Sequence, residues 1–216
     1  MGAHCSHGHS HDHDHDHGAF DGASPAYRRV LWIVIALNGA MFGIEIFAGA
    51  LSGSMALQAD ALDFAADAAT YGLSLWAIGR AAGTRAAVAL GKGASLAVMA
   101  AWVLGTTAWR ALAAVPPEPV TMSLVGVLAL SVNVGSALLL YRWRDGDANV
   151  ASVWLCTRND AIGNVAVMAA AGVVAATGTA WPDLAVAAAM SGLFLVSSVR
   201  ILRRALTERR HAAATA

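Results

Sequence analysis

Charged residues are scarce in this sequence. Only 13% of its 216 residues are Asp, Glu, Lys or Arg and 57% are hydrophobic, whereas a soluble domain carries about 25% charged residues. This composition excludes an ordinary soluble domain and indicates that lipid is the solvent for most of the chain. The formal net charge is zero, so there is no electrostatic case for nucleic acid as a partner.

Cysteine and proline are also rare, and their positions are informative. The two cysteines, Cys5 and Cys156, lie in very different contexts, so they do not suggest a disulfide framework. Every proline lies outside the long apolar runs, where a residue without an N–H would break a helix. The prolines are Pro25, Pro116, Pro117, Pro119 and Pro182.

Long apolar runs are what the sequence has instead. A membrane-spanning helix needs about 20 mostly apolar residues, and six segments have that length: 30–51, 54–78, 86–115, 120–141, 150–177 and 184–202. The sequence therefore predicts an all-α integral membrane protein with six transmembrane helices. We expect a disordered His/Asp-rich cytoplasmic tail at 1–27, a transmembrane domain at 28–204 and a short cytoplasmic tail at 205–216.

The loops at one predicted end of the bundle carry most of the basic residues. These are Arg28, Arg29, Arg80, Arg85, Arg142, Arg144, Arg200, Arg203, Arg204, Arg209 and Arg210. Near the other end only Arg110 is basic, and the loops there carry Glu118 and Asp183. Because Lys and Arg are enriched in cytoplasmic loops, both termini are predicted to be cytoplasmic.

Three aspartates interrupt the second apolar run, in the stretch "LQADALDFAADA". Aspartate is costly in a bilayer and therefore indicates a function there. Asp63 and Asp67 are four residues apart and share one helix face, which Asp60 borders. Cys156 and Asp160 have the same spacing in the fifth run. Two such faces in contact would offer three carboxylates and one thiolate, which is a suitable set for a tetrahedral divalent metal.

Other interpretations of these polar residues are hydrogen bonds between helices or ion pairs. Arg158 lies between Cys156 and Asp160, and Asp60 is its expected partner. In the first run, Asn38 and Glu45 are seven residues apart on nearly the same face. They are candidates for lining a permeation path or for bracing the second helix.

The N-terminal segment "HCSHGHSHDHDHDHG" is of low complexity and has too little apolar content to fold alone. It carries His4, His7, His9, His11, His13, His15 and His17. Imidazole and carboxylate groups bind zinc, nickel and cobalt, so we expect weak metal capture in this tail. The alternative is an expression tag, which the alternating aspartates and the embedded cysteine do not favour.

The chain resembles the cation diffusion facilitator family of divalent-metal/proton antiporters. The stretch "GSMALQADALDFAAD" is similar to the family's second helix, and "NGAMFGIEIFAGALSGS" to its first, with Asn38 and Glu45 at expected places. The resemblance implies that Asp63 and Asp67 are metal ligands. On the fifth helix it implies ligands at Cys156 and Asp160, with cysteine in place of the family's usual histidine.

The resemblance also implies what the protein does. We expect a multi-pass exporter in the bacterial inner membrane that exchanges a divalent metal for protons, acts as a homodimer, and is not an enzyme. Zinc is the first candidate, cadmium is favoured by the thiolate, and cobalt, nickel and iron stay open. The chain looks like a short form without the family's C-terminal cytoplasmic domain. The alternatives are a membrane metal sensor or accessory subunit, and a membrane-embedded metalloenzyme.

Overall fold

The computed structural model of the chain describes residues 24–76, 82–113, 115–145 and 148–214, and the His-rich tail predicted before them lies outside this part. Its secondary structure is entirely helical within these ranges. The elements are α1 Pro25–Ser52, α2 Met55–Trp76, α3 Ala82–Ala113, α4 Pro119–Leu140, the short 3-10 helix η1 Tyr141–Trp143, α5 Ala148–Thr177 and α6 Trp181–Ala214.

Five of the helices are long and apolar enough to cross a membrane. The apolar spans are Pro25–Ser52, Leu90–Ala113, Pro119–Trp143, Thr157–Thr177 and Trp181–Arg203. The remaining helix, α2, has the length but carries Asp60, Asp63 and Asp67 within its 22 residues. The predicted all-α membrane fold is therefore confirmed, with its acidic residues concentrated in α2.

The largest differences from the predicted helix boundaries are at the start of α1 and the end of α6. α1 begins at Pro25 because the Ser24 hydroxyl accepts the N–H of Tyr27 at 3.2 Å and proline suits the first helical position. α6 continues to Ala214, since Ala, Leu, Arg and Glu in its last turns all favour helix. Residues 25–27 and 205–214, predicted to belong to the two tails, are thus helical.

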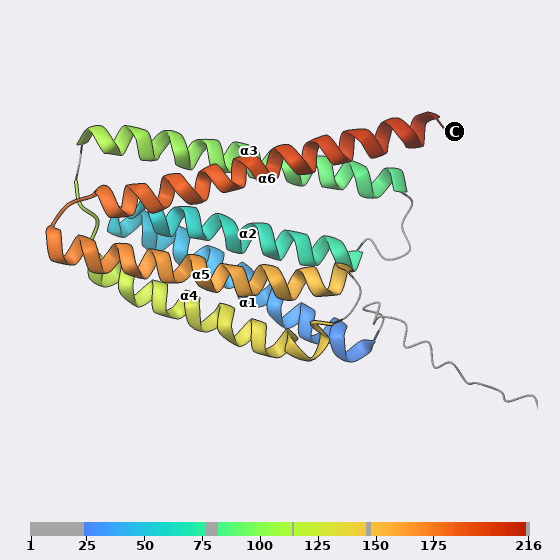
Figure 1. Cartoon of the computed structure of the whole chain (residues 1–216), viewed down its shortest axis with the longest axis horizontal. Helices are drawn as coiled ribbons and strands as arrows, with labels where there is room; N and C mark the ends of the chain where they lie inside the picture. The colour runs from blue at the N-terminus through green and yellow to red at the C-terminus, as the bar shows by residue number, and fades with distance from the viewer. Residues whose placement is uncertain (1–23, 77–81, 114, 146–147, 215–216) are drawn as a thin grey trace, which may run out of the picture.

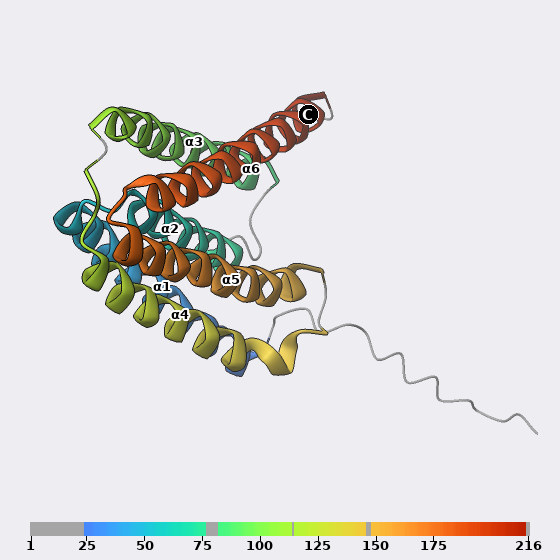
Figure 2. The same cartoon turned by 60° about the vertical axis from the view of Figure 1, so that its left-hand side comes forward.

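The helices run roughly side by side along one direction (Figure 1). The start of α1 and the end of α6 lie at the same end, together with the last residues of α2 and α4. We call this the basic end, because most of the predicted basic loops belong to it, and the other the opposite end. α3 and α6 pack along each other as a pair beside a group formed by α1, α2, α4 and α5 (Figure 2).

The core of the molecule is organised around α2, which contacts α1, α3, α5 and α6. At the opposite end an apolar cluster joins α2 to the α3/α6 pair, and includes Met55, Ala59, Leu62, Val103, Leu184 and Ala187. Towards the basic end another cluster joins α1, α2, α4 and α5, and includes Tyr27, Leu31, Tyr71, Leu140 and Val153. Among the described residues, α3 and α6 add nothing to this second cluster.

Burial along α2 changes at Asp63. Every residue of 54–62 is buried, whereas from Asp63 onward buried and partly exposed positions alternate. The half of α2 nearer the opposite end is therefore enclosed on all sides. The half nearer the basic end is enclosed only in part, and Asp63 stands at the boundary between the two halves.

Candidate functional site

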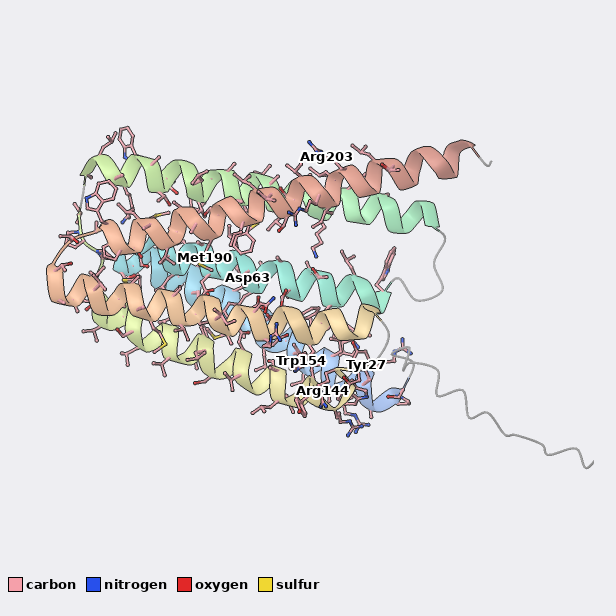
Figure 3. The ribbon with its side chains drawn as sticks, in the orientation of Figure 1. Tyr27, Asp63, Arg144, Trp154, Met190 and Arg203 are labelled. Atoms are coloured by element: carbon pink, nitrogen blue, oxygen red, sulfur yellow. The ribbon has the colours of Figure 1, made fainter. Side chains whose placement is uncertain are left out.

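Three of the four predicted metal ligands lie near one another, between α2 and α5. The Asp160 carboxyl of α5 lies close to both Asp63 and Asp67 of α2. Figure 3 shows Asp63 near the middle of the bundle's length. Asp63 and Asp160 are half-buried and Asp67 is buried. Three carboxyl groups this close repel one another when ionised, and a cation or bound protons relieve that repulsion.

The fourth predicted ligand, Cys156, belongs to α5, but its side chain lies outside the described residues. Among the described side chains, no group of three or more His, Cys, Asp or Glu residues is arranged to hold a metal ion. The structure therefore brings the aspartates together without forming a closed coordination shell from them. A fourth donor and an inward movement of the carboxyls are needed for tetrahedral coordination.

Tyr71 supports the site and was missed in the sequence. Its hydroxyl donates a hydrogen bond to Asp67 Oδ2 and lies 3.2 Å from the Thr157 hydroxyl of α5. Tyr71 is 1% exposed, so its hydroxyl forms its hydrogen bonds with protein groups. The spacing of four residues after Asp67 was the available signal, because it places Tyr71 on the same helix face.

Lys92 of α3 is a second residue that the sequence did not reveal. It is the single lysine of the chain, and its charge acts on Asp67. It lines a hollow of about 630 Å³ together with Ala69, Gly72 and Trp76 of α2. A cationic side chain from the α3/α6 pair therefore lies on the basic side of the aspartates. Its sequence position alone gives no indication of this, because the contact crosses between helices.

The predicted pairing of Arg158 with Asp60 is wrong. Arg158 is exposed, donates to Asn159 Oδ1 at 3.2 Å and lies 5.4 Å above the Trp154 ring. Asp60 is buried and its Oδ2 accepts a hydrogen bond of 2.6 Å from Asn164 Nδ2. The reason is geometric: Arg158 points away from the bundle, whereas Asn164 on the same helix points into it.

The two accessory residues predicted on α1 have different environments. Asn38 donates to the Val34 carbonyl of its own helix at 2.9 Å, so its amide braces α1. Glu45 is fully buried and its carboxyl lies beside that of Asp60. The predicted tail ligands His4, His7, His9, His11, His13, His15 and His17 lie outside the described residues.

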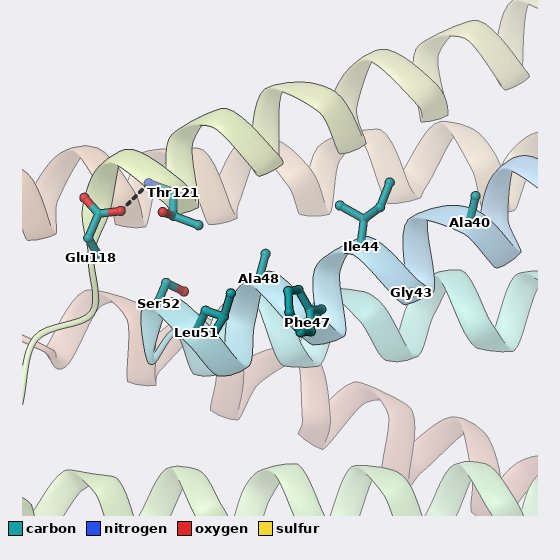
Figure 4. A pocket seen from close by; sticks show the side chains of 9 residues that line it. All are labelled: Ala40, Gly43, Ile44, Phe47, Ala48, Leu51, Ser52, Glu118 and Thr121. Carbon is teal, nitrogen blue, oxygen red and sulfur yellow. Dashed lines mark hydrogen bonds between the residues drawn. The ribbon is translucent and has the colours of Figure 1, made fainter.

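A surface groove between α1 and α4 is separate from this site. It has a volume of about 600 Å³ and is lined mainly by apolar residues such as Ile44, Phe47 and Leu51 (Figure 4). Glu118, at its end, is occupied in capping α4 through the N–H groups of Val120 and Thr121 at 2.9 and 2.6 Å. An apolar groove on a membrane helix is suited to lipid, and it offers no set of metal ligands.

Comparison with known proteins agrees with this architecture. A family model described as the cation efflux transmembrane domain matches residues 31–208. The metal cation efflux system protein CzcD of Cupriavidus metallidurans is 28% identical over 186 residues, covering 81% of this chain and 58% of that protein. The cation efflux system protein CzcD of an Alcaligenes species is 29% identical over 171 residues, covering 74% of this chain and 54% of that protein.

These matches decide the broad class. The chain spans a little over half the length of the two relatives, 58% and 54%. With the apolar helices, they confirm a multi-pass protein of the bacterial plasma membrane. The matched family is one of cation efflux and not of enzymes, as predicted. The chain belongs to the cation efflux family.

Proposed function

We propose that this protein exports a divalent metal cation, with zinc as the first candidate, in exchange for protons. The cation binds Asp63, Asp67 and Asp160, with Cys156 as the fourth ligand. The observation that carries this proposal is the position of the Asp160 carboxyl, close to both aspartates of α2. Metal binding requires deprotonated ligands, so metal and protons compete for the same oxygens. This competition couples the export of the metal to the inward movement of protons.

The burial pattern supports access from the basic end. Asp63 and Asp160 are half-buried, whereas residues 54–62 on the opposite side are buried. Trp76 of α2 and Lys92 of α3 line a hollow between these two helices. Because the positive-inside rule assigns the basic end to the cytoplasm, the metal enters from the cytoplasm in this conformation.

Release requires that the opposite end open in turn. The cluster of Met55, Leu62, Val103 and Leu184 closes that end by joining α2 to the α3/α6 pair. Sliding or rocking of this pair against α2 and α5 would expose the site to the other side, in keeping with alternating access around a midplane site. Protons from outside then take the place of the metal on the carboxylates and return inward.

Two further elements of the proposal concern selectivity and supply. A thiolate at Cys156 is a softer ligand than a carboxylate, which favours zinc and cadmium over cobalt, nickel and iron. The His-rich tail collects scarce metal near the cytoplasmic entrance. A homodimer is the proposed assembly, by the resemblance to the cation diffusion facilitators.

Zinc flux into sealed proteoliposomes tests this function. Zinc uptake should follow an imposed proton gradient, acid inside, and should stop when a protonophore collapses that gradient. A membrane metal sensor or accessory subunit binds zinc without such flux. Zinc movement that ignores the proton gradient would contradict the exchange mechanism, and absence of movement from a folded protein would contradict transport itself.

A further inference from the structure

Two carboxylates outside the candidate metal site face each other without any neutralising partner in the described part of the chain. Glu45 of α1 is 0% exposed and Asp60 of α2 is 1% exposed, and their carboxyl groups lie side by side. Glu45 Oε1, Glu45 Oε2 and Asp60 Oδ1 accept no hydrogen bond from any other described group, so these three oxygens have only the other carboxyl within hydrogen-bonding reach. Two ionised carboxylates buried without a partner are costly, so the pair holds either a shared proton or a cation.

Two buried amides hold Asp60 in place. Asn164 of α5 donates to Asp60 Oδ2 at 2.6 Å, and its own Oδ1 accepts from Asn133 of α4 at 2.9 Å. Both asparagines are 2% exposed or less. This series of hydrogen bonds engages Asp60 Oδ2 and leaves Asp60 Oδ1 facing the two Glu45 oxygens. Such outer hydrogen bonds are the usual means of orienting a carboxylate that ligates a cation.

The cations that the sequence offers as partners are engaged elsewhere. Arg158 lies on the outer surface of α5 against Trp154. Arg110 donates to the Gly53 carbonyl at 2.6 Å, and the charge of Lys92 acts on Asp67. Among the described side chains, therefore, none of opposite charge explains the pair.

The pair lies on the closed side of the candidate metal site. Asp60 precedes Asp63 by three residues, which is about 4.5 Å along a helix axis towards the opposite end. It belongs to the stretch 54–62 that is buried throughout. An ion leaving Asp63 towards the opposite end would meet Glu45 and Asp60 next.

We propose that Glu45 and Asp60 form a second cation site, which takes one divalent cation through carboxylate oxygens alone. When both carboxyls are ionised, the pair carries two negative charges, which one divalent ion neutralises, and it presents three oxygens that accept no bond from other described groups. Oxygen ligands without sulfur suit harder ions such as manganese, in contrast to a site with Cys156. The idea that this site lies on the exit route of the transported ion rests on the proposed function. Its ability to bind a cation does not.

Manganese binding by the full chain in detergent tests the proposal. The free Mn²⁺ signal in electron paramagnetic resonance counts bound ions as the metal is titrated. Glu45→Gln and Asp60→Asn should each bind one Mn²⁺ fewer per chain than the wild type. Asp160→Asn should retain that ion. The His-rich tail is present in every variant, so its contribution to Mn²⁺ binding cancels in the comparison. Glu118→Gln alters an exposed carboxylate and should bind as many Mn²⁺ ions as the wild type.

Size-exclusion profiles and helical circular dichroism identify the variants that fold. Glu45→Asp keeps the charge but withdraws it by one methylene. This variant should bind Mn²⁺ several-fold more weakly without changing the number of ions bound per chain. Equal Mn²⁺ binding by the wild type and by folded Glu45→Gln and Asp60→Asn overturns the proposal, because the pair then holds only a shared proton. Zinc flux separates this inference from the proposed function. Normal flux in Asp160→Asn would contradict the transport site and leave the Mn²⁺ count of the pair unaffected.

Discussion

Asp183 of α6 accepts a hydrogen bond of 2.6 Å from the Ser54 hydroxyl at the start of α2. Its two oxygens also accept from the backbone N–H groups of Met55 at 2.8 Å and Ala56 at 3.0 Å. A residue 129 positions away along the chain thus caps the helix that carries the candidate metal ligands. This contact ties α6 to α2 at the opposite end, where the bundle is closed.

Asp183→Ala removes this cap and leaves the first N–H groups of α2 buried without an acceptor. We expect a loss of about 1–2 kcal/mol in the free energy of unfolding, seen as a lower thermal midpoint in detergent. Asp183→Asn keeps one side-chain acceptor, so its midpoint should fall between those of Asp183→Ala and the wild type. Equal midpoints for all three proteins would show that the cap contributes nothing.

Close approach of α1 to α2 depends on Gly49. A Cβ atom at this position would meet Gln58 Cγ at 2.9 Å and the Gln58 backbone nitrogen at 3.1 Å. The backbone cannot withdraw, so Gly49→Ala should cost about 1–3 kcal/mol. Gly43→Ala is the matched control, because nothing lies within 4 Å of its Cβ. Midpoints of the two variants should differ, and the same midpoint for both would contradict the packing argument.

Acid should remove one source of stability at the opposite end. Hydrogen bonds from Thr121 and Val120 hold the pKa of Glu118 below its usual value. A carboxyl group whose pKa is lowered in the folded state stabilises that state above its unfolded pKa, and this contribution disappears as the pH falls through the folded pKa. The thermal midpoint of Glu118→Gln should therefore lie below that of the wild type at neutral pH. The difference should shrink as the pH drops below about 4.3, and a constant difference would contradict this account.

Cys156 sets the expected choice between metals. Cys156→Ser keeps the size of the side chain but supplies a poor ligand, so zinc and cadmium flux should both fall by about tenfold or more. Cys156→His restores the ligand usual in the cation diffusion facilitators, and it should transport zinc but lose preference for cadmium. Flux of both metals in proteoliposomes measures this. Unchanged zinc and cadmium flux in Cys156→Ser would exclude the thiol as a ligand.

Sequence periodicity predicted which residues share a face within a single helix. The spacing of Asp63 and Asp67 on α2 predicted a shared face, and Asp160 of α5 meets that face. The apolar runs predicted all six helices, because burial in lipid selects for length and composition. Boundaries were less accurate, since Ser24 at the start of α1 acts through a local hydrogen bond that hydropathy does not register.

Other contacts between distant helices could not be predicted in this way. The bond from Asn164 to Asp60 joins residues 104 positions apart, and the pairing of Arg158 with Asp60 was wrong because charge alone suggested it. Side-chain direction decided the outcome, because Arg158 is exposed whereas Asn164 is buried on the same helix. The role of Asp183 as a cap for α2 has no local pattern either, because the capped helix lies elsewhere in the chain.

Zinc flux in Asp160→Asn tests most directly whether Asp160 completes a transport site with the aspartates of α2. Asparagine preserves the size of the side chain but removes the charge, so insertion and helical content should match the wild type. Zinc flux into proteoliposomes under a proton gradient should fall to the level of protein-free vesicles, whereas Glu118→Gln should transport normally. Wild-type zinc flux in a folded Asp160→Asn protein would contradict the account.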